Sequence, residues 1–354
     1  MQIAVVGVGL IGGSVALAAR ERLDAEAVGF DPAPGVCEQA IAVGALDRAA
    51  SSVAAAVADA DAAFVAAPVG QLPALVAAVL DAAPPTCVVT DVGSTKRALQ
   101  ARAADERFVG GHPLAGAETA GIAHARADLF DGATWYLTPT QATSGILYER
   151  LHRLLAGLGA RPVAIDAELH DRLMATVSHL PHVLANVLVQ QAAAAHQGER
   201  LPTTGPSFRD ATRVAGANTS IWTDIYLSNR DALIAEIDAT VGRLGAVRDA
   251  LAAADADGIA AWNEAAAADR QAMQRAQADG GELHELRVPV PNRPGIVAEL
   301  TLALGRAGVN IADLALYPAA DMRDGVVAFW IAGSEPAQRA TAVVEDAGLQ
   351  VFRP

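Results

Sequence analysis

The sequence is poor in lysine, cysteine and aromatic residues, and each shortage narrows what the chain can be. Lys96 is the only lysine among 26 basic residues, so arginine is the usual cation of this chain. A lone lysine against that background is consistent with a site that needs a compact ammonium group, or with chance. Cys37 and Cys87 form neither a CxxC motif nor a disulfide framework, which is typical of a reducing cytoplasm. Aromatic residues make up 4% and hydrophobic residues 52%, so we expect a mainly aliphatic, largely helical core.

Positive charge and long apolar runs are also scarce. The net charge of −14 and the isoelectric point of about 4.9 argue against nucleic acid and anionic membrane surfaces as partners. The stretch Ala62–Leu80 is uncharged, but Pro68, Gly70 and Pro73 interrupt it, so we predict no membrane span. The strand-like segment Ile3–Val6 begins almost at the first residue, so we expect no signal peptide and a cytoplasmic protein.

The first residues carry the pattern of a dinucleotide-binding site. The apolar run Ile3–Val6 predicts a buried strand, and the glycine-rich segment Gly7–Gly12 follows it directly. A helical pattern then continues to about Arg22, and the next predicted strand ends in Asp31. A GxGxxG motif between a strand and a helix, with an acid about 20 residues further on, indicates a Rossmann-type site. The alternative is a glycine turn that binds no nucleotide.

Each residue of this motif has an expected role. Gly7 permits the tight turn, Gly9 lets the pyrophosphate approach, and Gly12 packs the helix against the strand. The carboxylate of Asp31 is expected to bind the ribose hydroxyls and to repel a 2′-phosphate. Because no arginine follows in residues 32–35, we predict NAD rather than NADP as the cofactor. The predicted cofactor contacts are Gly7, Gly9, Leu10, Ile11, Gly12, Asp31 and Pro68.

Apolar runs alternate with helical stretches as far as residue 165. This rhythm predicts an α/β domain with a doubly wound parallel sheet, which an antiparallel edge strand could extend. We therefore assign residues 1–165 to a dinucleotide-binding Rossmann domain. The later predicted strands are Ala62–Ala67, Cys87–Thr90, Phe108–Gly110, Thr134–Leu137 and Val163–Ile165.

The segment that follows Phe108–Gly110 holds a candidate proton acceptor. His112 lies among small residues, and Pro113 stiffens the chain beside it. Gly111 and Gly116 are expected to let the backbone approach a ligand closely. A histidine on a loop after a strand can titrate near neutral pH and accept a proton. The alternative is a turn histidine bonded to the backbone.

Ligands of such sheets bind outside the carboxyl ends of the strands. Ser94 and Lys96 follow the predicted strand Cys87–Thr90, and His112 follows the next one. We therefore expect all three side chains at one rim, beside the nicotinamide. For Ser94 the alternative is a cap for a helix over Arg97–Ala103.

Residues 166–282 change to a helical period, which predicts an all-α domain. Within the long segment Glu168–Gln197, Pro181 is expected to kink the helix. His179 and His182 are three residues apart, so they should share a face. Neither an HExxH nor an HxxxH spacing occurs there, so we predict no metal site. The histidines then serve packing or ligand contact.

Two arginines follow in the same domain. Arg209 and Arg213 are spaced to lie on one side of a helix, where two guanidinium groups suit a small dicarboxylate. The alternative is a solvated, salt-bridging face. Alanine-rich helices continue to about Ala278, and bundles of this kind commonly form homodimers. Residues 279–281 form a plausible linker.

Residues 283–354 predict a small ferredoxin-like module of βαββαβ order. This segment carries no obvious nucleophile or acid–base pair, so we expect it to bind a ligand rather than to perform chemistry. The predicted elements are His284–Val290, Ile296–Ala307, Val309–Tyr317, Val326–Ala332, Pro336–Ala347 and Leu349–Phe352.

Several motifs, in their order, resemble the prephenate/arogenate dehydrogenase family of tyrosine biosynthesis. They are GVGLIGGS, DVGSTK, GGHPLAGAETAG, SHLPH and FRDATR followed by IWTDIYLSN. The resemblance covers residues 1–282, and the remaining segment is similar to an ACT amino-acid-binding domain. It implies NAD(P)-dependent oxidative decarboxylation of a 4-hydroxycyclohexadiene that carries a ring carboxylate. Where family members often read Ser-Asp-Pro, this chain has residues 217–219 as Ala-Asn-Thr, which puts the local loop geometry in doubt.

The resemblance also assigns roles to individual residues. It implies that His112 accepts the proton of the substrate hydroxyl and that Ser94 orients that hydroxyl. His182 and Arg213 would line the substrate pocket, with Arg213 on a carboxylate, and Glu118 matches an acidic position thought to gate the pocket. We count His179 and Arg209 as further candidate substrate contacts.

For the last module we predict tyrosine, the end product of the pathway, as an inhibitory effector. The turn before Ile296 opens a helix whose free N–H groups could hold a carboxylate. ACT domains usually complete such a site between two modules, so a dimer would be needed. The alternative is that the module only stabilises the dimer. The candidate effector contacts are Asn292, Gly295, Asn310 and Ile311.

Three other functions remain open from the sequence. Prephenate and arogenate differ only in a keto or amino group on the side chain, and no residue here is assigned to read it. A β-hydroxyacid dehydrogenase would need a lysine base, and Lys96, the only candidate, lies too early in the chain. A non-enzymatic NAD sensor would not need the proton acceptor His112.

Overall fold

The computed structural model describes residues 1–100, 104–116, 119–195, 204–277, 282–319 and 324–353. Contacts within the chain divide it into two compact units. One comprises Met1–His170 together with Glu282–Pro354, and the other comprises Asp171–Gly281. Within the described part of the chain, every helix is too short or too polar to cross a membrane.

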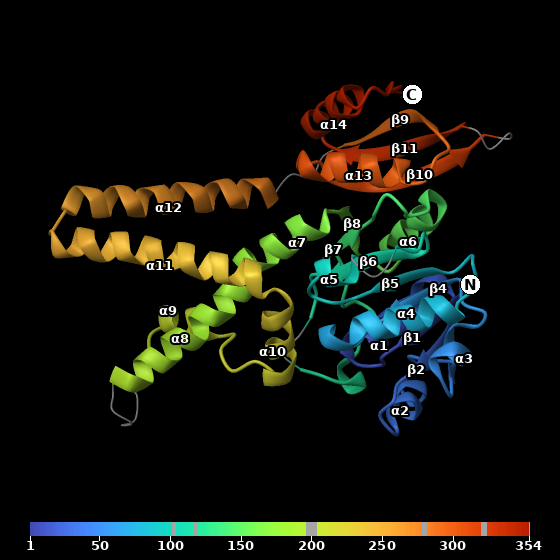
Figure 1. Cartoon of the computed structure of the whole chain (residues 1–354), viewed down its shortest axis with the longest axis horizontal. Coiled ribbons are helices and arrows are strands. Elements are labelled where there is room, and N and C mark those ends of the chain that lie inside the picture. The colour runs from blue at the N-terminus through green and yellow to red at the C-terminus, as the bar shows by residue number, and fades with distance from the viewer. Residues whose placement is uncertain (101–103, 117–118, 196–203, 278–281, 320–323, 354) are drawn as a thin grey trace. The chain divides into compact units, whose positions relative to one another are not determined.

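The first unit is built on an eight-stranded sheet with the order β3-β2-β1-β4-β5-β6-β7-β8 (Figure 1). The strands from β3 to β6 are parallel, β7 is antiparallel to β6, and β8 is parallel to β7. The sequence therefore predicted both the doubly wound sheet and its antiparallel extension correctly. The strands are β1 Gln2–Val6, β2 Glu26–Phe30, β3 Arg48–Ala49, β4 Ala62–Val65, β5 Val88–Asp91, β6 Phe108–Pro113, β7 Thr134–Thr138 and β8 Arg161–Ala164.

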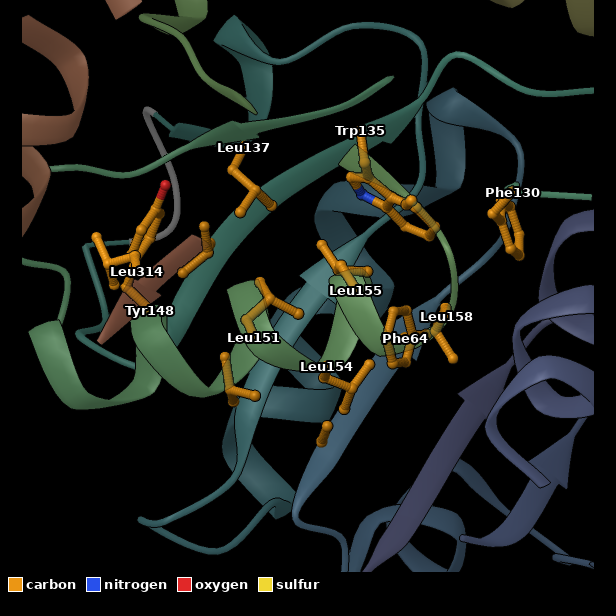
Figure 2. Close-up of a cluster of buried hydrophobic side chains, with 14 of the residues drawn as sticks. Phe64, Phe130, Trp135, Leu137, Tyr148, Leu151, Leu154, Leu155, Leu158 and Leu314 are labelled. Carbon is orange, nitrogen blue, oxygen red and sulfur yellow. The ribbon is translucent and has the colours of Figure 1, made fainter. Parts of the chain in front are cut away.

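Helices flank this sheet. The hydrophobic core between them consists mainly of aliphatic side chains, with a few large aromatic rings. Trp135 of β7 meets Phe64 of β4 edge-on, with ring centroids 6.2 Å apart, and lies 5.0 Å from the ring of Phe130. The leucines of α6 pack beside these rings (Figure 2). The helices are α1 Leu10–Leu23, α2 Val36–Ala42, α3 Val53–Val57, α4 Leu72–Ala82, α5 Arg97–Gln100 and α6 Gly145–Gly157, with short 3₁₀ turns at Val69–Gln71 and Ile122–His124.

Strand β6 is longer than predicted, and this changes the setting of His112. Gly110–Pro113 pairs with Trp135–Thr138 of β7, so the strand continues past Gly110 instead of ending there. His112 therefore lies within a strand, opposite Tyr136, and not on a loop. The sequence could not reveal this because the partner strand comes some twenty residues later.

The second unit is helical. The unit begins at Asp171, inside helix α7 Ala167–Met174. This helix continues through a π-helical turn, Ala175–His179, into α8 Leu180–Ala195. The expected irregularity at Pro181 is this turn, since proline offers no N–H to the preceding helix. The remaining helices are α9 Pro206–Thr212, α10 Thr219–Ser228, α11 Arg230–Ala252 and α12 Ala256–Gln277. The helices α11 and α12 lie side by side (Figure 1).

The C-terminal module belongs to the first unit. It contains β9 Leu283–Pro291, α13 Ile296–Arg306, β10 Ile311–Pro318, β11 Asp324–Ala332 and α14 Ser334–Asp346. Its antiparallel sheet has the order β10-β11-β9. The predicted last strand, Leu349–Phe352, is reduced to a single bridge between Phe352 and Arg287 of β9.

The module shares one hydrophobic core with the nucleotide domain. Tyr148 of α6 is buried in the same cluster as Leu314 of β10 and Val297 of α13 (Figure 2). The backbones also approach closely: a Cβ on Gly305 would lie 2.3 Å from the carbonyl oxygen of Ala164. The module therefore packs as part of this unit. The predicted linker, residues 279–281, lies outside the described residues.

Candidate active site

The loop between β1 and α1 has the shape of a pyrophosphate cradle. Gly7 has a φ of +94°, and a Cβ there would lie 2.2 Å from the carbonyl oxygen of Ala66. A Cβ on Gly12 would lie 2.0 Å from the carbonyl oxygen of Gly7. By contrast, a Cβ on Gly9 would meet no described atom within 4 Å, so the space above this residue is open. Two glycines close the turn, and the third leaves room for a ligand.

The N-terminus of α1 faces this open space. Gly9 is its N-cap, and among the described residues no side chain caps the helix there. Exposed N–H groups and the helix dipole favour an anion at this position. Leu10 and Ile11, in the first turn, are half-buried. Pro68 is exposed three residues after β4, the strand beside β1.

Asp31 directly follows β2 and lies beside this loop. Its Oδ2 accepts a hydrogen bond from the Val8 N–H at 2.8 Å, and its Oδ1 accepts one from the Ala33 N–H at 2.9 Å. The carboxylate is therefore fixed against the glycine loop. The cradle, the helix terminus and this acid together fit NAD, which these residues would hold.

Asp91, at the end of β5, connects the loop that carries Ser94 with strand β6, which carries His112. Its carboxylate accepts hydrogen bonds from the Gly93 N–H at 2.7 Å and the Gly111 N–H at 3.1 Å, and forms an ion pair with Lys96. Both side chains of the pair are fully buried. Lys96 therefore has a structural role at this edge of the sheet. The interpretation that its ammonium group contacts a ligand is not supported.

Gly111, beside His112, has a different role from the expected one. A Cβ on Gly111 would lie 2.5 Å from the carbonyl oxygen of Asp91, so this glycine allows β5 and β6 to approach each other. Only Gly116, where a Cβ would meet no described atom within 4 Å, borders open space. The expectation that Gly111 admits a ligand is wrong, because the neighbouring strand already occupies that side.

His112 is half-buried, and the ring of His170 contacts its ring. Its Nδ1 lies 2.9 Å from Nε2 of His170, and the two rings meet edge-on with centroids 5.1 Å apart. His170, in α7, is fully buried and also meets the ring of Tyr136 edge-on at 5.7 Å. No feature of the sequence points to His170. It lies 58 positions from His112 in an amphipathic helix, and no motif spacing links the two.

Ser94 is half-buried three residues beyond β5. Because β5 pairs in parallel with β6, Ser94 and His112 lie at the same edge of the sheet, as predicted. Glu118 lies outside the described residues.

In the helical unit, the two histidines that were predicted to contact the substrate both contact the ring of Trp222. The ring of His182 stacks on Trp222 at 3.5 Å, and the buried His179 meets the same ring edge-on at 6.1 Å. The expectation that they share a face is therefore confirmed. Nδ1 of His179 also lies 3.2 Å from Nδ2 of Asn229, whose amide donates to the Asp171 carbonyl. His179 is thus built into the packing of this unit.

His182 is the more accessible of the two. Its Nδ1–H donates to the Ser178 carbonyl at 3.1 Å when Nδ1 carries the proton, which leaves Nε2 as an acceptor. Burial lowers the pKa of His182, and the positive charge of Arg213 lowers this pKa further. His182 therefore favours its neutral form near neutral pH.

Arg209 and Arg213 lie at the end of α9 and are exposed. Arg209 donates from Nη1 to the Thr204 carbonyl at 3.2 Å. The divergent segment at 217–219 forms a regular helix start, because Asn218 Oδ1 caps α10 by accepting from the N–H groups of Ser220 and Ile221. Among the residues that the structure describes, no three His, Cys, Asp or Glu side chains are grouped to hold a metal.

A Rossmann-type sheet, a pyrophosphate cradle and a histidine at the carboxyl edge define a dinucleotide-dependent dehydrogenase. Comparison with known families agrees and is more specific. The model for the prephenate dehydrogenase nucleotide-binding domain matches residues 15–164, and the model for the prephenate dehydrogenase dimerization domain matches residues 166–264. The chain belongs to the prephenate dehydrogenase family.

Individual relatives extend this similarity. A prephenate dehydrogenase from Bacillus subtilis is 30% identical over 356 residues, which span 97% of this chain and 95% of that protein. A cyclohexadienyl dehydrogenase from Zymomonas mobilis is 33% identical over 263 residues, or 72% of this chain and 90% of that protein. The crystal structure of an Aquifex aeolicus prephenate dehydrogenase with hydroxyphenyl propionate and NAD+ superposes with a TM-score of 0.73 at 27% identity, covering 77% of this chain and 98% of that one.

Proposed function

We propose that this chain is a prephenate dehydrogenase that converts prephenate to 4-hydroxyphenylpyruvate with NAD. The observation that carries the proposal is His112, which lies toward the carboxyl edge of the sheet that also carries the dinucleotide cradle, and which contacts His170 through Nδ1. By this proposal the other ring nitrogen of His112, Nε2, takes the substrate proton. NAD, when bound, supplies the hydride acceptor.

The residues around the substrate then have separable tasks. Neutral His112 accepts the proton of the ring hydroxyl through Nε2 as the carbinol carbon loses its hydride. The ring carboxylate leaves as carbon dioxide, its bonding electrons complete the aromatic ring, and the proton returns to the phenolic oxygen. No net proton is consumed. Since aromatisation makes the reaction downhill, the protein mainly has to align the reactants and provide a base.

The helical unit supplies candidates for recognition of the two substrate carboxylates. Arg213 is exposed and offers a fork that can bind a carboxylate through two hydrogen bonds. Neutral His182 can donate or accept a hydrogen bond without adding charge. By this proposal Arg213 binds a carboxylate and His182 lines the pocket. His179 and Arg209 are further candidate substrate contacts. Ser94 orients the hydroxyl next to His112.

The competing functions fit the site less well. A β-hydroxyacid dehydrogenase needs an accessible lysine base, whereas Lys96 is buried in an ion pair with Asp91. A non-enzymatic NAD sensor would not need a proton acceptor such as His112 at the carboxyl edge of the sheet. Arogenate remains a second candidate substrate, because a Synechocystis arogenate dehydrogenase superposes on 77% of this chain with a TM-score of 0.68 at 28% identity.

The substrate is tested by following NADH formation with purified enzyme. We expect prephenate to support turnover with a higher kcat/KM than arogenate at equal NAD. A higher kcat/KM for arogenate would assign the second activity instead. No NADH with either compound would contradict the proposal.

We also propose that the chain forms a homodimer through its long helices α11 and α12. These helices expose several large apolar side chains, and a groove of about 490 Å³ lies between them, lined by residues such as Val247, Ile259 and Trp262. Exposed apolar surface of this kind marks a protein contact. The large apolar residues exposed on the two helices are Ile234, Val241, Leu244, Leu251, Trp262 and Met273.

For the C-terminal module we propose an ACT-type fold that binds tyrosine and thereby inhibits the enzyme. The bridge of Phe352 to β9 puts the chain end where the fourth strand of a ferredoxin-like sheet would lie. A cavity of about 150 Å³ lies between this module and the nucleotide domain, and Asn292 lines it together with Glu106, Ser144 and Asp324. Acidic side chains on its wall suit the ammonium group of an amino acid, and the start of α13 suits its carboxylate.

The other expected effector residues lie elsewhere. Gly295, Asn310 and Ile311 do not appear in the lining of this cavity. A Cβ on Gly295 would lie 2.5 Å from the carbonyl oxygen of Gln141, and Asn310 is exposed. Of the candidate effector residues, Asn292 therefore lines the cavity, whereas Asn310 lies outside it, at the exposed start of β10. A site completed by a second module would use Asn310.

Point substitutions test the effector site, because deletion of the module would uncover the apolar face of α6. If tyrosine binds in the cavity, Asn292→Ala weakens tyrosine inhibition while Asn310→Ala leaves it unchanged. The reverse pattern assigns the site between two modules. Tyrosine that inhibits both variants equally, and competitively with prephenate, acts at the active site and contradicts an effector role for the module.

A further inference from the structure

We infer that His170 is a positioning residue for His112: it accepts a hydrogen bond from Nδ1–H of His112 and so fixes the tautomer that can act as the base. The contact is direct, with 2.9 Å between His112 Nδ1 and His170 Nε2. The inference rests on the proposed role of His112 in proton transfer.

The two possible directions of this hydrogen bond have opposite consequences. If His112 donates from Nδ1, its Nε2 carries a lone pair and can take a proton. If His170 donates instead, neutral His112 must hold its own proton on Nε2 and cannot accept another. Catalysis therefore requires His170 to be the acceptor, with its own proton on Nδ1.

The surroundings of His170 suit a fixed, neutral acceptor. The residue is fully buried, where a charged imidazole is costly, and the ring of Tyr136 meets it edge-on at 5.7 Å. Its backbone N–H donates to the Asp166 carbonyl at 2.8 Å, and Asp166 Oδ1 accepts from two further N–H groups at the start of α7. The helix that carries the ring is therefore anchored.

The same contact serves the protonated state. Once His112 has taken the substrate proton, its Nδ1–H donates a charge-assisted bond to His170, which is stronger than the bond between neutral rings. A histidine in this place orients the base as the aspartate of a serine protease does, but without adding a negative charge beside the substrate carboxylates.

The experiment compares His170→Gln with His170→Leu in the full-length enzyme, with NAD and prephenate. Glutamine keeps an acceptor oxygen, whereas leucine fills similar space without one. We expect His170→Leu to lower kcat by roughly 10- to 100-fold, the usual effect of losing a hydrogen bond to a charged group, with KM for NAD unchanged. His170→Gln should retain most of kcat.

A packing role predicts the opposite order, because leucine suits a buried apolar position better than glutamine. The melting temperature of each variant is measured, and His170→Met serves as a second apolar variant if the leucine variant does not fold. His152→Leu, a buried histidine on α6, is the control and should keep full activity.

Equal kcat in His170→Leu and His170→Gln would overturn the inference. His112→Asn, measured in parallel, separates this from failure of the proposed function. If His112→Asn abolishes turnover but the two His170 variants are equal, only the positioning role is wrong. If His112→Asn remains active, the role of His112 itself is wrong.

Discussion

At the scale of single residues, the site depends on groups held by backbone contacts or by a partner ring. Asp31 is fixed by two N–H groups, Asp91 by two more, and the ring of His112 by His170. Side chains restrained in this way lose little further entropy when a ligand binds. Each can therefore be tested by a substitution that keeps the restraint and removes the chemistry.

Asp31 is expected to enforce the choice of NAD. Asp31→Asn keeps an oxygen that can accept from the Val8 N–H but removes the negative charge that repels a 2′-phosphate. We expect the ratio of kcat/KM for NAD to that for NADP to fall by at least about tenfold, as loss of one close charge repulsion implies. Asp31→Ser, which also loses the bond to Val8, should bind both cofactors more weakly. A wild-type enzyme that uses NADP as well as NAD would contradict this role.

Arg213 is expected to bind a substrate carboxylate. Arg213→Ala should raise KM for prephenate by roughly 10- to 150-fold, which corresponds to about 1.5–3 kcal/mol for a charge-assisted hydrogen bond. Arg213→Lys should recover only part of this, since lysine lacks the fork. Arg270→Ala, at an exposed position of α12, is the control. An unchanged KM in Arg213→Ala would assign the arginine to structure.

At the scale of elements, local patterns predicted most strands, and partners distant in the sequence decided the rest. The apolar run before Gly7 and the acid at Asp31 are local signals, so β1, α1 and β2 were predicted well. The extension of β6 through His112 depends on pairing with β7, and the burial of Lys96 depends on Asp91 of the neighbouring strand. The contact between His112 and His170 depends on the position of α7 against the sheet. The hydrophobic periodicity of the sequence does not reveal that position.

Helix α6 carries a buried histidine that should make stability depend on pH. Both ring nitrogens of His152 lack a hydrogen-bond partner among the described residues, and burial lowers the pKa of His152 to about 4, although the negative charge of Asp313 acts in the opposite direction. In the unfolded chain this histidine titrates near pH 6.5. The unfolded state therefore binds more protons between about pH 6.5 and 4, and stability falls as the pH decreases through that range.

His152→Leu should remove this dependence. Between pH 7 and 5 the wild type should lose about 2 kcal/mol of unfolding free energy more than the variant does. Urea denaturation at the two pH values measures the difference, and His124→Leu, at an exposed histidine, should behave like the wild type. The same loss in wild type and His152→Leu would show that His152 is not responsible.

At the scale of the whole molecule, the sequence predicted three segments, whereas contacts join the first and the last into one unit. The sequence predicts a strand over Val309–Tyr317 but not what covers it. That cover is α6 of the nucleotide domain, through Tyr148 and its neighbours (Figure 2). A ligand in the cavity beside this contact would therefore act on the domain that is proposed to hold NAD.

The central claim is that His112 is the base in prephenate oxidation. The most direct measurement is kcat of His112→Asn with saturating prephenate and NAD, together with the affinity for NAD. Loss of a positioned base should lower kcat by about 10²- to 10⁴-fold, while NAD affinity stays unchanged because the cradle is formed by the loop after β1. A variant that turns over prephenate at close to the wild-type rate would contradict the account.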